Sequence, residues 1–290
     1  MTVVVVTDSS SRLQPEDLQR CGIRQVPLHV LLDGRDFRDG VDEVPRDVHR
    51  HHATTAGATP AELAEAYREA LKQSGGDGVV AVHISAALSS TYSSAVSTAR
   101  EFGPAVRVIN SRSAAMGVGF VTLAAAQEAA TGADIDAVEA AARSAASRGH
   151  AFIVVHRLDN LRRSGRIRRG ASLLGSALSL KPLLCLDVDG RLVLGQRIRT
   201  ATKAHAAMID QVAEVVGDGG ARIAVHHVDN PDAADDIAKT LSVRLPQIAP
   251  PSVTEMGPVL AVHVGAGAVG VCIDLDVDAD VDPDVDVDQA

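Results

Sequence analysis

Side chains that can bind an anion are concentrated in one short stretch of the chain. Residues 79–84 are apolar and mostly β-branched, which predicts a buried strand, and an apolar repeat that starts at Ala95 predicts a helix. The loop between them is rich in hydroxyl groups, among them Ser85 and Ser89. Because the first turn of a helix has free N–H groups and a partial positive charge, such a loop can hold a carboxylate or a phosphate. The alternative is that these hydroxyls only cap the helix.

One histidine could extend this chemistry. His263 lies in an apolar, strand-like segment of residues 260–264, where a lone histidine is most often a hydrogen-bonded core residue. It could instead pair with Ser89 or Ser85 and act as the base of a hydrolase, but the G-x-S-x-G motif of many hydrolases is missing. The core reading is favoured, and the Ser–His pair stays open as the alternative.

Other motif-like patterns are weak. Three histidines at positions 49, 51 and 52 stand in a charged segment, for which a solvated surface is favoured over a metal site. Residues 265–270 match G-x-G-x-x-G, but no long helix follows, so the pattern predicts a tight turn and not a dinucleotide site. A Walker A motif is missing, and the sequence gives no support for ATP binding by this chain.

The first half of the chain alternates strands and helices. Strands are predicted over residues 3–6, 23–32, 79–84 and 106–110, and helices lie between and after them. Thr59, Pro60 and Glu62 form a capping box at the start of one helix. The alternation predicts a mostly parallel sheet, whose ligand site lies beyond the carboxyl ends of the strands.

The second half mixes strand directions. Asp189-Gly190 predicts a hairpin between strands at 183–186 and 191–196. Further strands are predicted over residues 152–155, 223–227, 252–256, 260–264 and 269–273, and helices over 171–180, 201–216 and 233–241. We therefore predict an α/β fold of two α/β domains, residues 1–150 with a mostly parallel sheet and residues 151–273 with a mixed sheet.

Composition and charge narrow the function classes. Of the 290 residues 46% are hydrophobic and only 2% aromatic, so the core must be built from Ala, Val, Leu and Ile. Eight aspartates follow one another at every second position from Asp274 to Asp288 and account for most of the net charge of −9. The rest of the chain is close to neutral, which argues against a nucleic-acid binder. Residues 274–290 are predicted to be an acidic, disordered tail.

Localisation signals are few. The N-terminal residues predict a strand rather than a secretory signal, and no apolar stretch is long enough to insert stably in a membrane. The three cysteines are far apart and odd in number, which favours free thiols in a reducing cytoplasm. We expect a cytoplasmic protein.

Taken together, the motifs resemble those of the DegV family over essentially the whole chain up to about Ile273. The segments that carry the resemblance are Thr7-Asp8-Ser9, Thr54-Thr55 before Thr59-Pro60, Ile84-Ser85-x-x-Leu88-Ser89-x-Thr91-Tyr92, Met116-Gly117-x-Gly119, Leu158-x-x-Leu161-x-x-x-Gly165-Arg166-Ile167, Lys181-Pro182, Arg197-x-Arg199 and His263-Val264-Gly265-x-Gly267-Ala268. Each motif alone is weak, and their number and order carry the assignment.

The resemblance implies a non-catalytic carrier of long-chain fatty acids. In such a protein an apolar tunnel at the domain junction holds the acyl chain, and a separate ATP-dependent fatty acid kinase subunit converts the carboxylate to an acyl phosphate. Carried over by motif, Thr55, Ser89 and His263 would hold the carboxylate, with Thr54 and Ser85 as second candidates. Arg166 and Arg199 would contact the partner or the new phosphate. The resemblance implies no metal and no cofactor besides the fatty acid itself.

Overall fold

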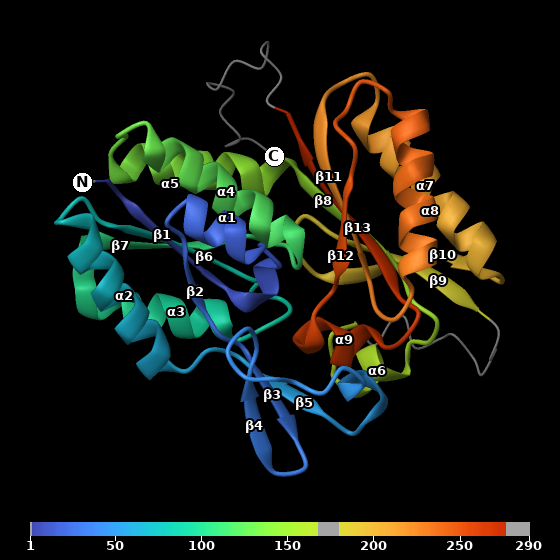
Figure 1. Ribbon diagram of the computed structural model, residues 1–290, viewed down its shortest axis with the longest axis horizontal. Helices are drawn as coiled ribbons and strands as arrows, with labels where there is room; N and C mark the ends of the chain where they lie inside the picture. The colour runs from blue at the N-terminus through green and yellow to red at the C-terminus, as the bar shows by residue number, and fades with distance from the viewer. Residues whose placement is uncertain (1, 168–179, 277–290) are drawn as a thin grey trace, which may run out of the picture.

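The computed structural model describes residues 2–167 and 180–276, which form two lobes (Figure 1). The N-terminal lobe, residues 2–148, is built on a four-stranded parallel sheet with the order β2-β1-β6-β7. These strands are β1 (Val4–Asp8), β2 (Arg24–Val26), β6 (Val79–His83) and β7 (Val106–Asn110). The predicted parallel sheet is thus confirmed.

Helices cover both faces of this sheet, as the apolar strands require. On one face lie α2 (Pro60–Ser74) and α3 (Thr91–Ala99), and on the other α1 (Pro15–Arg20), α4 (Met116–Ala130) and α5 (Ile135–Arg148) (Figure 1). The predicted capping box at α2 is present, because the Thr59 hydroxyl accepts from the Glu62 N–H and Glu62 accepts from the Thr59 N–H. Short 3-10 turns are η1 (Ser9–Ser11), η2 (Val48–Arg50) and η3 (Arg100–Ala105).

A small antiparallel sheet, β4-β3-β5, extends from the N-terminal lobe. Its strands are β3 (His29–Leu32), β4 (Arg35–Arg38) and β5 (Thr54–Ala56). The single strand predicted over residues 23–32 is therefore wrong. It breaks near Pro27, which has no N–H to continue a ladder, and its two parts join different sheets. The solvated surface predicted for the three histidines holds for His51 and His52, which are exposed, but is wrong for His49, which is buried against Asp229.

The C-terminal lobe, residues 149–276, is built on a six-stranded sheet with the order β10-β9-β8-β13-β11-β12. Its strands are β8 (Gly149–Val154), β9 (Lys181–Leu186), β10 (Leu192–Ile198), β11 (Ala221–His227), β12 (Ser252–Glu255) and β13 (Val269–Leu275). Only the β11–β12 pair is parallel, which confirms the mixed sheet. The predicted domain boundary after residue 150 falls inside β8, which begins directly after α5 ends.

Helices α7 (Ala201–Val216) and α8 (Pro231–Arg244) cover the outer face of the six-stranded sheet, and its inner face is turned to the N-terminal lobe (Figure 1). Two short helices, α6 (Asp159–Arg163) and α9 (Pro258–Val264), lie close together near the small sheet. None of the helices in residues 2–167 and 180–276 is long and apolar enough to cross a bilayer.

Two further predictions need correction. The segment 260–264 is helix α9 and not a strand, because Pro258 occupies the first helical turn and Gly265, at a φ of 77°, ends the helix. The acidic tail does not begin at Asp274. That side chain is buried in β13, where its carboxylate pairs with Arg148 and Arg222. The rest of the predicted tail from residue 277, and most of the predicted helix 171–180, lie outside the described residues.

Candidate functional site

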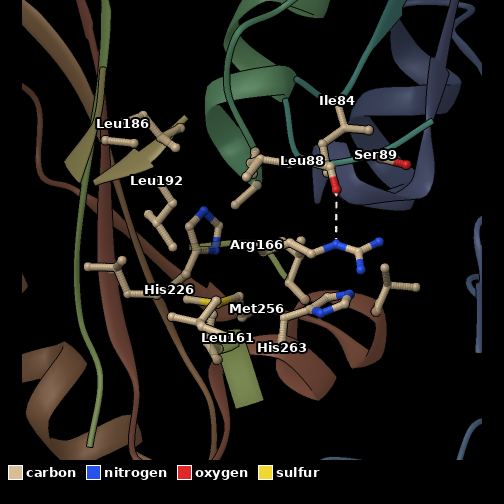
Figure 2. A pocket seen from close by; sticks show the side chains of 18 of the residues that line it. Ile84, Leu88, Ser89, Leu161, Arg166, Leu186, Leu192, His226, Met256 and His263 are labelled. Carbon is tan, nitrogen blue, oxygen red and sulfur yellow. Dashed lines mark hydrogen bonds between the residues drawn. The ribbon is translucent and has the colours of Figure 1, made fainter. Parts of the chain in front are cut away.

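A cavity of about 350 Å³ lies between the two lobes (Figure 2). This volume falls within the range of about 300–1,000 Å³ that is usual for ligand pockets. Most of its wall is apolar, with Leu28, Ile84, Leu88, Phe152, Ile153, Leu161, Leu186, Leu192, Met256, Val259 and Leu260 among the lining residues. Its few polar groups are gathered largely in one place, so the cavity has a polar end and a long apolar remainder.

Thr55 and His263 form the centre of the polar end. A hydrogen bond of 2.8 Å joins the Thr55 hydroxyl to Nε2 of His263, although the two residues come from different lobes. Strand β5 carries Thr55, and the last turn of α9 carries His263. The two side chains meet because α9 packs against β3 and β5. Residues 55 and 263 were both predicted site residues, and the structure brings them into direct contact.

The imidazole of His263 has one nitrogen left over. Its Nδ1 is buried and has no hydrogen-bond partner among the described residues. Burial, with the positive charge of Arg166 as a second cause, lowers the pKa of His263 from 6.5 to about 4. The ring is therefore neutral at physiological pH. Because a buried polar atom without a partner costs about 1–3 kcal/mol, this nitrogen is poised to accept or donate a hydrogen bond to a ligand.

Ser89 completes the polar end from the loop between β6 and α3. Its oxygen accepts a hydrogen bond from the Thr91 N–H at 3.2 Å and lies 2.8 Å from the Thr91 hydroxyl. When the Thr91 hydroxyl donates in this pair, the Ser89 proton is free to point into the cavity. The hydroxyl-rich loop thus both caps the start of α3, as the alternative reading held, and lines the cavity.

Arg166 brings a permanent positive charge to the same place. Its Nε donates to the Leu88 carbonyl at 3.2 Å, and its Nη1 donates to the carbonyl of Ser164 (Figure 2). Gly165, at a φ of 71°, makes the turn that directs the arginine toward the cavity. Arg166 was predicted to contact a partner or a phosphate, and it lines the cavity with Thr55, Ser89 and His263.

Three predicted residues do not reach the cavity. Thr54 is exposed, because it points to the opposite face of β5 from Thr55. Ser85 is buried, and its hydroxyl donates to the Gly190 carbonyl at 2.8 Å, a contact between the lobes. Arg199 is exposed just after β10. The assignment of Thr54 and Ser85 to carboxylate binding therefore needs correction, since neither side chain faces the cavity.

The hydrolase alternative gains no support from the hydrogen bonds. A serine nucleophile needs a direct hydrogen bond to its base, and the base needs a third group that orients it. Here Nε2 of His263 bonds to Thr55, and the Ser89 hydroxyl bonds to Thr91. Among the described residues no carboxylate contacts His263, so the pair lacks the orienting group of a triad.

Comparison with known proteins places this fold in a family. The family described as "Uncharacterised protein, DegV family" has a sequence model that matches residues 2–276. The chain belongs to the DegV family. A DegV domain-containing protein of Mycobacterium tuberculosis is 64% identical over 269 residues, which are 93% of this chain and 96% of the relative. One from Streptomyces coelicolor is 40% identical over 91% of this chain and 95% of its own length.

Solved structures of DegV proteins share the fold. A DegV family protein from Thermus thermophilus, described by its fatty acid binding, superposes with a TM-score of 0.88 at 32% identity, covering 95% of this chain and all of that one. DegV of Bacillus subtilis, described as a fatty acid binding protein, superposes with a TM-score of 0.83 at 26% identity over 95% of this chain and 100% of that one. The predicted DegV resemblance and α/β fold are confirmed.

Sequence reasoning missed one DegV cavity residue, His226. It is the second-last residue of β11 and lies on the opposite side of Arg166 from Ser89 (Figure 2). Its Nε2 accepts from the Met116 N–H at 3.2 Å and its Nδ1 lies 2.9 Å from the Thr254 hydroxyl, so both nitrogens are occupied. Burial lowers the pKa of His226 to about 3. The signal in the sequence was its place at the carboxyl end of a predicted strand.

Proposed function

We propose that this chain binds a long-chain fatty acid, with the acyl chain in the apolar cavity and the carboxylate at Thr55, Ser89 and His263. The fatty acid binding described for the DegV protein of Thermus thermophilus supports the ligand class. The local chemistry supports the orientation, because the polar groups lie at one end and hydrocarbon side chains line the rest.

The observation that carries the proposal is the pairing of Thr55 with His263 across the two lobes. When the Thr55 hydroxyl donates to Nε2, the neutral imidazole carries its proton on Nδ1, which has no partner among the described residues. That N–H and the Ser89 hydroxyl can donate to a carboxylate oxygen, which accepts several hydrogen bonds at once. Arg166 supplies the compensating positive charge, because His263 itself is neutral.

Energetically, the two ends of the ligand have different roles. Burying about sixteen carbons at about 0.8 kcal/mol per methylene contributes about 12 kcal/mol, from which the entropy of association is subtracted. The cavity therefore supplies the affinity. The hydroxyl, imidazole and guanidinium groups contribute less and fix which end of the molecule faces outward.

The chain would act as a carrier and not as an enzyme. As the DegV resemblance implies, it would present the carboxylate to a separate ATP-dependent fatty acid kinase in the cytoplasm. The kinase would transfer a phosphoryl group to the carboxylate and form an acyl phosphate. The exposed side chain of Arg199 is accessible to such a partner, whereas Arg166 is held near the carboxylate end. We assign Arg199 to docking and Arg166 to the carboxylate or its phosphorylated product.

Fatty acid binding is tested by denaturing the purified protein and measuring released acyl chains by mass spectrometry. Titration of the lipid-free protein with palmitic acid then compares three variants: Thr55→Val, Ser89→Ala and His263→Gln. Ser89→Ala and His263→Gln lose a hydrogen bond to a charged group, and Thr55→Val loses the partner that keeps the His263 proton on Nδ1, so each predicts a loss of affinity of about 10- to 100-fold.

Thr54→Val is the matched control, because it makes the same chemical change on the exposed face of the same strand. It is expected to bind like the unmodified protein. Absence of any acyl chain after purification, together with no binding in the titration, contradicts the proposal.

The carrier role is tested with a fatty acid kinase catalytic subunit, ATP and palmitate. The expected result is that Arg199→Ala reduces acyl phosphate formation but keeps palmitate binding. Unchanged acyl phosphate formation by Arg199→Ala contradicts the docking role of Arg199, and formation of acyl phosphate without this chain contradicts the carrier role.

A further inference from the structure

A glycine near the start of a central strand lies in the wall of the cavity. Gly270 belongs to β13, where it pairs with Ile153 of β8 on one side and with His226 of β11 on the other. A glycine weakens the interior of a strand and often marks a place where a ligand approaches the backbone closely. The backbone of Gly270 does not need a glycine, because its φ lies outside the left-handed region.

Neighbouring atoms lie close to the position that a Cβ atom of residue 270 would occupy. A Cβ atom at this position would lie 3.2 Å from the Phe152 carbonyl oxygen, 3.4 Å from Cε of Met256 and 3.5 Å from Cβ of Ile153. Every second residue of a strand faces the same side of its sheet, so Gly270 faces the cavity together with Cys272. A larger side chain at residue 270 would therefore occupy cavity space next to Met256.

This part of the cavity is suited to hydrocarbon, although two of its side chains carry polar atoms. Both ring nitrogens of His226 are used, by the Met116 N–H and the Thr254 hydroxyl. The Cys272 thiol donates to the Ala114 carbonyl at 3.5 Å, and burial raises its pKa to about 12. Neither residue needs a polar partner from a ligand. In Figure 2 Met256 and His226 lie to the left of Ser89, the Arg166 guanidinium and the His263 ring, on the side away from these polar groups.

We propose that Gly270 determines the length of acyl chain that the cavity accepts. Without a side chain at residue 270, Cε of Met256 packs close to the strand and leaves the neighbouring cavity space to the last methylene groups of a long chain; a side chain there would displace Met256 into that space. This inference rests on the proposed fatty acid binding and adds to it a residue that selects among fatty acids. Short acids, which do not extend to Met256, are expected to be indifferent to residue 270.

The test is a titration of lipid-free Gly270→Ala and Gly270→Val with decanoic, lauric, palmitic and stearic acids. Each methylene that is kept out of the cavity weakens binding by about fourfold. Gly270→Ala should therefore weaken stearic acid binding by about fourfold, and Gly270→Val by about 16- to 60-fold. Decanoic acid should bind both variants with nearly unchanged affinity, so the preferred chain becomes shorter.

Gly195 provides the matched control. It also lies in a strand of the six-stranded sheet, and a Cβ there would be 3.3 Å from the Leu183 carbonyl oxygen, but residue 195 does not line the cavity. Gly195→Ala and Gly195→Val should keep the chain-length profile of the unmodified protein. Adding Met256→Ala to Gly270→Val should restore stearic acid binding, because it removes the side chain nearest to the added methyl groups.

The outcomes distinguish the length-determining role of Gly270 from fatty acid binding itself. If the unmodified protein binds palmitic and stearic acids but the Gly270 variants keep its profile, or weaken acids of every length equally, the length-determining role is overturned and fatty acid binding stands. If the unmodified protein binds none of the four acids, both ideas fail. Circular dichroism checks that each variant is folded, and Gly270→Ala decides the case if Gly270→Val does not fold.

Discussion

The low pKa of His263 predicts that the stability of the ligand-free protein depends on pH. In the folded chain His263 stays neutral down to about pH 4, because its ring is buried and lies near the positive charge of Arg166. In the unfolded chain it takes up a proton near pH 6.5. Between these two values the unfolded state binds more protons, so the stability is fully present above pH 6.5 and is lost as the pH falls toward 4.

The size of the loss follows from the two pKa values. They differ by about 2.5, and each pKa unit corresponds to about 1.4 kcal/mol, so His263 should lower the free energy of unfolding by about 3 kcal/mol over this range. His263→Gln keeps an amide that can bond to Thr55 and has no proton to gain. It should therefore lack this part of the pH dependence.

Urea unfolding of the lipid-free protein, followed by circular dichroism between about pH 7 and about pH 4, measures the effect. Other titrating groups contribute equally to both proteins and cancel in the difference. Arg166→Gln should make the His263 loss smaller and end it at a higher pH, because removing one cause of the low pKa raises the pKa of His263 in the folded state. If the unmodified protein and His263→Gln lose stability in parallel as the pH falls, the assignment of a buried, neutral His263 is refuted.

Three further predictions concern stability. Ala115→Gly should stabilise the protein by about 1 kcal/mol, measured by urea unfolding. Ala115 has a φ of 53° and a ψ of −143°, a strained conformation that glycine adopts freely. A loss of stability in this variant would contradict the strain at Ala115. Asp274→Asn should destabilise it by about 2–3 kcal/mol, since two arginines lose their buried anion, and thermal unfolding with and without added salt measures this. Tyr67→Phe should cost about 1–2 kcal/mol in the same assay, because Nε2 of buried His83 loses its partner at 3.0 Å; an unchanged melting temperature would refute that role.

Elements with strong local signals could be predicted from the sequence. Thr59, Pro60 and Glu62 start helix α2 through contacts within four residues of one another, so the pattern alone was sufficient. The apolar runs of β1 and β6 likewise predicted buried parallel strands, because such strands are covered on both faces, whereas β7 at the edge of the sheet is only partly buried. The hairpin at Asp189-Gly190 was predicted for the same kind of local reason.

Long-range contacts decided the elements that were mispredicted. Residues 260–264 are apolar without a clear period, and such a short run fits a strand or a buried helix equally well. Asp274 reads as the first residue of an acidic repeat, and only the fold brings Arg148 and Arg222 to it. No local pattern in the sequence contains that information.

The same distinction applies within the candidate site. Thr54 and Thr55 are neighbours of the same type, and the pairing of β5 with β3 decides which of them faces His263. A shift of one residue in that register would exchange them, because successive side chains of a strand point to opposite faces. The sequence could therefore nominate the pair but could not choose between them.

The division of charge between His263 and Arg166 would let the proposed site bind a carboxylate while Thr55 and His263 join the two lobes. A protonated imidazole between Thr55 and the guanidinium would add a second positive charge to a buried place, which burial and Arg166 both oppose. A guanidinium does not lose its proton in proteins, so it would offer the proposed carboxylate a positive charge at every physiological pH. The neutral histidine would then orient the ligand. One of its nitrogens bonds to Thr55 of the other lobe, and the other is available to the ligand. A ligand oxygen on Nδ1 would thus be held by a group that already joins the two lobes, and closure of the lobes and orientation of the carboxylate would depend on the same side chain.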